Sequence, residues 1–360
     1  MTPKQRLLNS LKGKEVDRVP WSPFLAYFWD TQPKNIREKG QRAFIEDIGG
    51  DPLLRGFYSL YKTKYKTCTV SEKTKGNERI ITYETPVGTL YTTYTYSPDG
   101  DTWYLTGHPV KTEEDFKILT YINEDKYLIP NMEDFNQAYK QIGDNGLYLP
   151  IIGSESKSSF QSLLEHWVGT ENLIYAMMDY PKTVENCLQA MRENSIESVK
   201  ISVQSPAEGF ISWEDSSTTN LSPALFEKYI APEINQWGNI IHQHDKLYIL
   251  HACGHLKDLI PIMAKMDIDA IESISPPPTG NVEVWDARKI LPEHIALIGG
   301  IEPTVFLNST LEELESYTIN LLKKMGTSRY VLANSDSCPP GVAFEKFKLV
   351  SSILKQNLHK

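Results

Sequence analysis

The sequence predicts an α/β fold, a (β/α)8-type barrel that carries an antiparallel β insertion. From about residue 145 onward, short apolar runs alternate with helical patterns, which is typical of parallel strands joined by right-handed crossovers. Residues 56–110 break this alternation with a stretch rich in Thr, Tyr and Ile that also contains turn signals. Such a stretch indicates hairpins. We expect these hairpins to cover one mouth of the barrel, and residues 1–360 to form a single domain.

Six strand–helix units account for most of the predicted barrel. Their strands are expected at residues 147–152, 209–213, 247–253, 269–274, 295–301 and 330–335. A seventh strand is expected at 18–24, after an N-terminal helix in which Thr2 and Gln5 have the spacing of a capping box. An open, doubly wound sheet is the competing architecture. It is less well supported, because no Gly-rich nucleotide-binding turn follows the first strand.

Composition and charge exclude several classes of protein. The chain is 40% hydrophobic and 23% charged, with 37 Lys and Arg residues against 46 Asp and Glu residues, a net charge of −9. This mildly acidic balance argues against a nucleic-acid or anionic-membrane partner, because both need a basic surface. No apolar stretch approaches the roughly 20 residues that span a bilayer. The N-terminal segment lacks the apolar core of a secretion signal, so we expect a cytoplasmic protein.

The four cysteines are far apart in the sequence and show no disulfide framework. Reduced thiols are therefore expected. Cys187 follows the apolar spacing of a helix and is interpreted as a core residue. Cys68 lies in the β-rich insertion. Cys253 and Cys338 are the two that remain for chemistry.

The strongest local signal is the pair His251 and Cys253 at the end of the strand predicted at 247–253. In a strand, residues i and i+2 point to the same side, so the imidazole and the thiol should converge where barrel active sites lie. Cys338 directly follows the strand predicted at 330–335 and should face the same mouth. One His and two Cys with an open fourth position are ligands of a catalytic zinc ion. The alternative is that His251 only bonds a backbone carbonyl.

Acidic residues at strand ends are further candidates. Glu214 and Asp215 end the strand predicted at 209–213 and are expected to face the same mouth, as proton donors, partners of His251 or substrate ligands. The alternative is that they only start the following helix. Asp336 is a candidate for orienting a metal ligand. Weaker candidates of the same kind are Glu155, a further possible zinc ligand, Glu272 and Glu302.

Several segments resemble the uroporphyrinogen decarboxylase superfamily. In chain order they are DRVPWSPF, GTENLIYAMMDYPKTVENCL, ISWEDSSTTNLSPALFEKYIAPEI, HACGHLKDLIPIMAKMDIDAIESI and IALIGGIEP. The resemblance implies a (β/α)8 barrel with an active site at the strand ends. Decarboxylases of this superfamily carry an arginine-rich segment near the N-terminus that clamps the substrate carboxylates. The equivalent stretch here, residues 21–28, contains no arginine, so the decarboxylation of a tetrapyrrole is not expected.

The other branch of the superfamily contains zinc methyltransferases that work with corrinoid proteins. Their His-x-Cys pattern followed far downstream by Cys is matched by His251, Cys253 and Cys338. The resemblance therefore implies a zinc-dependent methyltransferase that moves a methyl group between a small molecule and a corrinoid supplied by a partner protein. Methanol, a methylamine, an aromatic ether, a thiol and tetrahydrofolate all remain open as the small molecule. The aromatic residues Tyr27, Phe28 and Trp213 suit an apolar substrate such as a methylated aromatic compound, or serve packing.

Two other functions are compatible with the same sequence. One is a metal-independent decarboxylase or lyase that acts on an acid other than a porphyrinogen. The other is a non-catalytic protein that binds a corrinoid or a tetrapyrrole.

Overall fold

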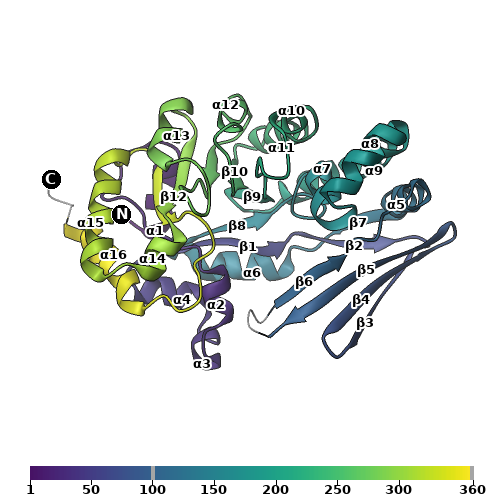
Figure 1. The fold of residues 1–360 in the computed structure, drawn as a ribbon. Coiled ribbons are helices and arrows are strands. Elements are labelled where there is room, and N and C mark those ends of the chain that lie inside the picture. The colour runs from purple at the N-terminus through teal and green to yellow at the C-terminus, as the bar shows by residue number, and fades with distance from the viewer. Residues whose placement is uncertain (99–101, 357–360) are drawn as a thin grey trace.

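The core of the molecule is a curled parallel sheet. A computed structural model describes residues 1–98 and 102–356. Within them the sheet has seven strands, in the spatial order β1 (Leu53–Ser59), β8 (Leu147–Ile151), β9 (Gly209–Glu214), β10 (Leu247–Ala252), β11 (Ala270–Glu272), β12 (Ala296–Ile301) and β13 (Tyr330–Asn334). Helices surround it (Figure 1). The fold is thus the predicted α/β barrel type.

Residues 19–22 take the eighth place in the barrel, between β13 and β1. Trp21 forms a parallel bridge with Leu332 of β13, and the backbone N–H of Asp51, just before β1, donates to the carbonyl of Trp21 at 2.6 Å. Pro20 and Pro23 have no N–H to donate, so this segment cannot form a regular ladder. The strand predicted at 18–24 is therefore reduced to one bridge. Strand β1 is a barrel strand that was not predicted, and only its residues 56–59 fall in the predicted insertion.

The helices match the alternation of the sequence. Their bounds are α1 (Pro3–Leu11), α2 (Ala26–Asp30), α3 (Lys34–Arg37), α4 (Gly40–Asp47), α5 (Glu113–Asp125), α6 (Glu133–Ile142), α7 (Ser159–Ser162), α8 (Thr170–Asp179), α9 (Pro181–Ser202), α10 (Pro223–Leu225), α11 (Ala231–His242), α12 (Ile260–Met263), α13 (Val284–Ile290), α14 (Pro303–Asn308), α15 (Leu311–Met325) and α16 (Phe344–Gln356). Thr2 and Gln5 form the expected capping box on α1. Among the described residues, no helix combines the length and apolarity that crossing a membrane requires.

The insertion consists of antiparallel strands beside the barrel (Figure 1). A four-stranded sheet runs β3 (Thr69–Lys75), β4 (Glu78–Thr85), β5 (Gly88–Ser97) and β6 (Thr102–Gly107), and β2 (Tyr61–Tyr65) pairs with β7 (Lys126–Pro130). Residues 99–101 of the predicted insertion lie outside the described part. The sheet packs on α5, where Gly88 approaches Ile118 so closely that a side chain at this position would clash. It therefore lies beside the barrel on the side of α5 (Figure 1), and Tyr83 of β4 contacts Trp167 with 5.3 Å between ring centroids.

The inner core of the barrel follows the period of two that strands impose. Ile211 of β9 and Ile249 of β10 belong to a buried cluster inside the sheet, together with Leu53, Leu147, Leu149, Leu247, Ala270, Ala296, Ile298, Val331 and Ala333. Leu7 and Leu11 of α1 join the same cluster, so α1 closes the end of the barrel at which the strands begin. The next inward positions of β9 and β10 lie at the opposite mouth, where barrel enzymes place their chemistry.

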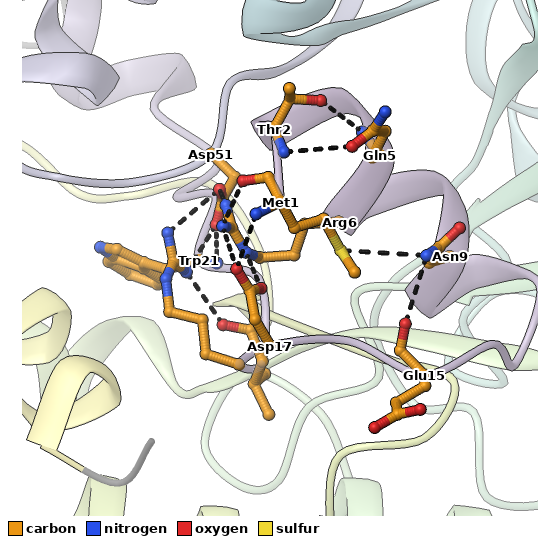
Figure 2. A network of polar contacts seen from close by, with 11 residues as sticks. Met1, Thr2, Gln5, Arg6, Asn9, Glu15, Asp17, Trp21 and Asp51 are labelled. Atoms are coloured by element: carbon orange, nitrogen blue, oxygen red, sulfur yellow. Dashed lines mark hydrogen bonds and ion pairs between the residues drawn. The ribbon is translucent and has the colours of Figure 1, made fainter. Parts of the chain in front are cut away.

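A buried carboxylate fixes the irregular closing segment. Asp51 has no exposed side-chain surface and forms ion pairs with Arg6 and Arg18. Its Oδ2 also accepts the backbone N–H of Trp21 at 3.0 Å. Figure 2 shows Arg6 of α1, Asp51 and Trp21 converging at one point. The network therefore joins α1, the closing segment and the start of β1.

A second buried carboxylate makes stability depend on pH. Glu233 on α11 is buried and accepts the N–H and hydroxyl of Ser159 at 3.0 and 2.9 Å. Burial raises the pKa of Glu233 to about 7, so between pH 5 and 7 the folded chain keeps a proton that the unfolded chain has released. Raising the pH through this window therefore lowers the free energy of unfolding.

Replacing Glu233 with glutamine removes this titration and keeps a hydrogen-bond acceptor. We expect the decline of the unfolding free energy between pH 5 and 7 to become shallower by up to about 1.4 kcal/mol per pH unit. Urea denaturation at several pH values measures it. The variant Glu345→Gln changes an exposed glutamate of α16 and should keep the wild-type slope. Equal slopes in all three proteins would contradict the expectation.

Candidate metal centre

Three side chains with metal-binding atoms meet at the mouth of the barrel. A carboxylate oxygen of Asp215, a ring nitrogen of His251 and the Sγ of Cys253 all lie within 4.8 Å of one another. The Cys253 thiol donates to Asp215 Oδ1 at 3.0 Å. The three line a cavity of about 680 Å³. Asp215 and Cys253 follow the last residues of β9 and β10, and His251 lies in β10 itself.

The orientation of His251 is set by a chain of buried charges across the barrel. His251 Nδ1 lies 3.0 Å from Glu272 Oε2, at the end of β11. The other oxygen of Glu272 pairs with Arg55 of β1, and Arg55 also donates to the carbonyls of Leu53 and Ser22 at 3.0 and 3.1 Å. Burial alone would raise the pKa of Glu272, but Arg55 and His251 together outweigh burial and lower that pKa. With Nδ1 engaged, Nε2 is the nitrogen left for a metal.

Asp215 is held as a carboxylate by a buried lysine. Lys157 Nζ lies 3.1 Å from Asp215 Oδ2 and also pairs with Glu165. Burial by itself would raise the pKa of Asp215, but the charge of Lys157, the hydrogen bond from Cys253 and the charge of His251 together lower that pKa to about 2. Burial raises the pKa of Glu165 to about 7. Asp215 is therefore ionised at neutral pH, and its carboxylate oxygen is available to bind a metal ion.

The Cys253 thiol is unreactive without a cation. Burial, followed by the charges of Asp215 and Asp336, raises the pKa of Cys253 well above its ordinary value. At neutral pH the sulfur therefore keeps its proton, and only the thiolate is a nucleophile or a metal ligand. A divalent ion in this group would reverse that balance.

The structure separates two acids that were expected to face the same mouth. Asp215 lines the cavity, but Glu214 is fully buried on the other side of β9, where it accepts the N–H and hydroxyl of Ser158. The reason is the strand period of two: Ile211 and Asp215 point inward, so Glu214 must point toward the outer helices. Glu214 is thus placed to hold the backbone at Ser158, and not to contact a substrate.

The loop after β13 carries two candidate residues, Asp336 and Cys338, and only Asp336 lines the cavity. Burial raises the pKa of Asp336. Cys338 is fully buried, with its Sγ 3.8 Å from the carbonyl of Pro339, and it is not a member of the metal-binding group found among the described residues. Its backbone is fixed by hydrogen bonds of 2.8 Å with Phe24 and Phe28.

The three weaker acidic candidates, Glu155, Glu302 and Glu272, have different hydrogen-bond partners. Glu155 lines the cavity and accepts the indole N–H of Trp167 at 2.7 Å. Glu302 caps α14 by accepting the N–H of Val305 at 2.8 Å. Glu272 is fully buried and contacts His251, as described above. The sequence reasoning missed Arg55 and Lys157, whose roles depend on contacts between distant strands.

The aromatic residues form one wall beside this centre. The rings of Phe24 and Trp213 are stacked at 5.5 Å, and both contact the ring of His251, at 5.6 and 4.7 Å between centroids. Tyr27 lies at the rim, with 58% of its surface exposed. Phe28 faces away into the core, so it does not line this cavity.

The sequence profile described as uroporphyrinogen decarboxylase (URO-D) matches residues 98–356. The chain belongs to the uroporphyrinogen decarboxylase family. This membership agrees with the barrel and with a site at the ends of its strands. No curated protein sequence gives a significant match.

Two solved structures are similar to this uroporphyrinogen decarboxylase family member. A methyltransferase from Methanosarcina mazei is 14% identical, with 99% of each chain covered and a TM-score of 0.64. A B12-independent methionine synthase from Shewanella sp. W3-18-1, solved in complex with selenomethionine, is 10% identical, with 95% of this chain and 99% of that chain covered and a TM-score of 0.47. The first similarity establishes a shared fold over the whole chain.

Proposed function

We propose that this family member is a zinc-dependent methyltransferase that moves a methyl group between a small molecule and a corrinoid carried by a separate protein. The observation that carries the proposal is the meeting of Asp215, His251 and Cys253 within 4.8 Å at the barrel mouth. Imidazole nitrogen, cysteine sulfur and carboxylate oxygen are all zinc ligands. The adjoining cavity of about 680 Å³ leaves room for a small molecule beside them.

The proposed zinc ligands are His251, Cys253 and Cys338, in keeping with the His-x-Cys and downstream Cys pattern. Asp215 is the competing third ligand, because its carboxylate already lies in the group. When bound, zinc keeps a coordinated thiolate deprotonated at neutral pH or polarises a methyl donor.

Other residues prepare the site through hydrogen bonds. Glu272 holds His251 in one orientation. Asp215 Oδ1 accepts the thiol proton of Cys253 in a hydrogen bond, and Lys157 keeps Asp215 charged for that task. Glu214 fixes Ser158 and so the neighbouring Lys157. We assign Asp215 and Asp336 to proton handling and substrate contact, and Glu214 to positioning.

A corrinoid protein is the proposed partner, and the cytoplasm is the proposed compartment. The parallel strands of the described chain are used by the barrel, which leaves the corrinoid to a second protein that docks over the mouth. All four cysteines are free, as expected in a reducing compartment.

Methyl exchange tests the proposal directly. Purified protein should contain about one zinc ion per chain and should exchange methyl groups between free methylcobalamin and members of a panel of thiols and methylated compounds. Full activity after exhaustive removal of metal would contradict it. Tight binding of cobalamin without exchange would favour a carrier protein instead.

A metal-independent decarboxylase is the second candidate, because the family is named after a decarboxylase. The lining of the cavity favours it less. The described lining offers Lys157, His166 and His251 as basic residues, but Lys157 is already paired with two carboxylates and His251 with Glu272. Release of carbon dioxide from an organic acid by metal-free protein would establish this function.

The role of Glu272 gives a separate test of the metal centre. Glu272→Gln should lower the affinity for zinc by about 10- to 100-fold, the usual cost of losing a carboxylate that orients a metal-binding histidine. Competition with a chromophoric chelator measures that affinity. Glu302→Gln is a matched control, because Glu302 is equally buried at the next strand end but contacts α14. Equal zinc affinities in the two variants would remove Glu272 from the site.

A further inference from the structure

The segment that follows α7 is a π-helical turn. In this turn, Leu163–Trp167, the N–H of Val168 donates to a carbonyl five residues earlier, at 2.8 Å. Three consecutive side chains of the turn, Glu165, His166 and Trp167, lie at or beside the cavity. Single π turns inside helices occur frequently at functional sites, so each of these side chains is a candidate for a role in the chemistry.

The first and third of these side chains are engaged, and the second is not. Glu165 pairs with Lys157, and the indole N–H of Trp167 donates to Glu155 at 2.7 Å. His166 lines the cavity itself. Within residues 1–98 and 102–356, neither ring nitrogen of His166 has a hydrogen-bond partner. The turn therefore presents a free imidazole to the cavity that the metal-binding group also lines.

His166 can accept a proton at neutral pH. Burial, followed by the charge of Lys157, lowers its pKa from the ordinary value of 6.5. The ring is therefore neutral, with one nitrogen unprotonated. A metal ion in the same cavity would lower this pKa further, because a second positive charge also disfavours the imidazolium. His166 is thus a neutral imidazole both with and without a bound cation.

Four other groups of the lining are already committed. Asp215, His251 and Cys253 form the metal-binding group. Lys157 is paired with two carboxylates. Burial alone would lower the pKa of Lys157, but these carboxylates outweigh burial and raise it. The amine of Lys157 therefore keeps its proton and cannot act as a base.

The three remaining titratable groups of the lining are less suited to keep an added proton. Burial, followed by the charge of Asp336, raises the pKa of Tyr27, so this phenol is already protonated. Glu155 lies 3.8 Å from the amine of Lys126, which favours its carboxylate form. Burial raises the pKa of Asp336, but a metal ion at the neighbouring ligands would favour the carboxylate. Asp336, like Asp215, can therefore accept a hydrogen bond but passes the proton on.

We infer that His166 is the catalytic base that takes the proton of the methyl acceptor during transfer from the corrinoid. The inference rests on the proposed function and adds a residue to it. With a thiol as acceptor, the S–H bond breaks, its proton passes to the neutral ring of His166, and its electron pair stays on sulfur. The sulfur then bonds the methyl carbon as the carbon–cobalt bond breaks, and that electron pair stays on cobalt, which is reduced from Co(III) to Co(I). In the reverse direction, His166 returns the proton to the leaving group.

Chemical rescue tests this role. Zinc-containing His166→Ala should transfer methyl groups from free methylcobalamin to 2-mercaptoethanol about 10²- to 10⁴-fold more slowly than the unchanged protein, the usual contribution of a general base. Added imidazole should restore part of the rate, because its neutral form can enter the space left by the side chain. His166→Gln fills that space and should show the same loss without rescue. His294→Ala changes an exposed histidine outside the cavity and should alter neither the rate nor its response to imidazole.

An acceptor that is already ionised separates this role from a structural one. 4-Nitrothiophenol is a thiolate at neutral pH and has no proton to give up, so both His166 variants should methylate it at nearly the rate of the unchanged protein. Equal losses with the two thiols, full activity of His166→Ala with 2-mercaptoethanol, no rescue by imidazole, or loss of zinc from the variants would overturn the inference and leave the proposed function standing. Absence of exchange in the zinc-containing unchanged protein would contradict the proposed function itself.

Discussion

Cys253→Ser is expected to lose the bound zinc and to lower the rate of methyl exchange by on the order of 10³-fold, the value of several kcal/mol of metal-derived stabilisation. Cys253 supplies the sulfur of the donor group at 3.0 Å from Asp215. A serine hydroxyl remains protonated where a thiol becomes a zinc-bound thiolate, so the variant keeps the shape of the site but not its ligand. Elemental analysis and exchange with free methylcobalamin measure the two effects on one sample.

Cys68→Ser is the matched control for this variant. Cys68 is also a free cysteine, but it lies before β3 in the insertion and outside the cavity lining. Its substitution should leave zinc content and exchange unchanged. If Cys253→Ser retains one zinc per chain, or retains exchange without zinc, the metal-based mechanism is wrong.

The identity of the third ligand is settled by comparing Cys338→Ser with Asp215→Asn. We expect Cys338→Ser to release more zinc, because two thiolates and an imidazole form a tighter zinc site than one thiolate with a carboxylate. Cys338 lies on a loop whose backbone is tied to Phe24 and Phe28, and its buried Sγ lies outside the group of Asp215, His251 and Cys253, so zinc binding by Cys338 requires its side chain to move toward the cavity. Greater zinc loss in Asp215→Asn would instead assign the ligands as Asp215, His251 and Cys253.

Most of the barrel could be predicted because its strands are buried on both faces and its helices are amphipathic. Strand β1 was missed because Arg55 and Gly56 interrupt its apolar run. Gly56 has a φ of +68°, and a side chain there would come within 2.9 Å of the Trp213 ring. Arg55 is buried by a partner on β11, more than 200 positions away in the sequence. A local pattern contains no information about either contact.

The part of the candidate site that depends on the alternation of side chains along one strand could be predicted from the sequence. His251 and Cys253 could be paired from the strand period alone, and the structure brings them together. The same rule, applied to Glu214 and Asp215, would have shown that adjacent strand residues point to opposite sides. Lys157 could not be assigned, because its role follows from Glu165, in the π-helical turn Leu163–Trp167, and from Asp215, at the end of a strand.

Asp51→Asn is expected to be the most damaging conservative substitution away from the mouth, lowering the free energy of unfolding by about 3–5 kcal/mol. Asp51 is fully buried between Arg6 and Arg18 and holds the N–H of Trp21. The amide keeps the shape of the carboxylate but leaves Arg18 without its anion and Arg6 with only the partly exposed Asp17. Such a loss is a large part of the 5–15 kcal/mol that stabilises a typical domain.

The comparison with Asp17→Asn makes this prediction specific. Asp17 also pairs with Arg6, but 37% of its side chain is exposed, so its replacement should cost only about 1 kcal/mol. Urea denaturation at pH 7 measures both variants, and hydrogen exchange at the Trp21 N–H reports whether the closing segment opens first. Because this segment joins β13 to β1, weakening it should open the barrel at that seam and also loosen Phe24, three residues on, which contacts His251. Equal stabilities of the two variants would mean that the buried charges are not what closes the barrel.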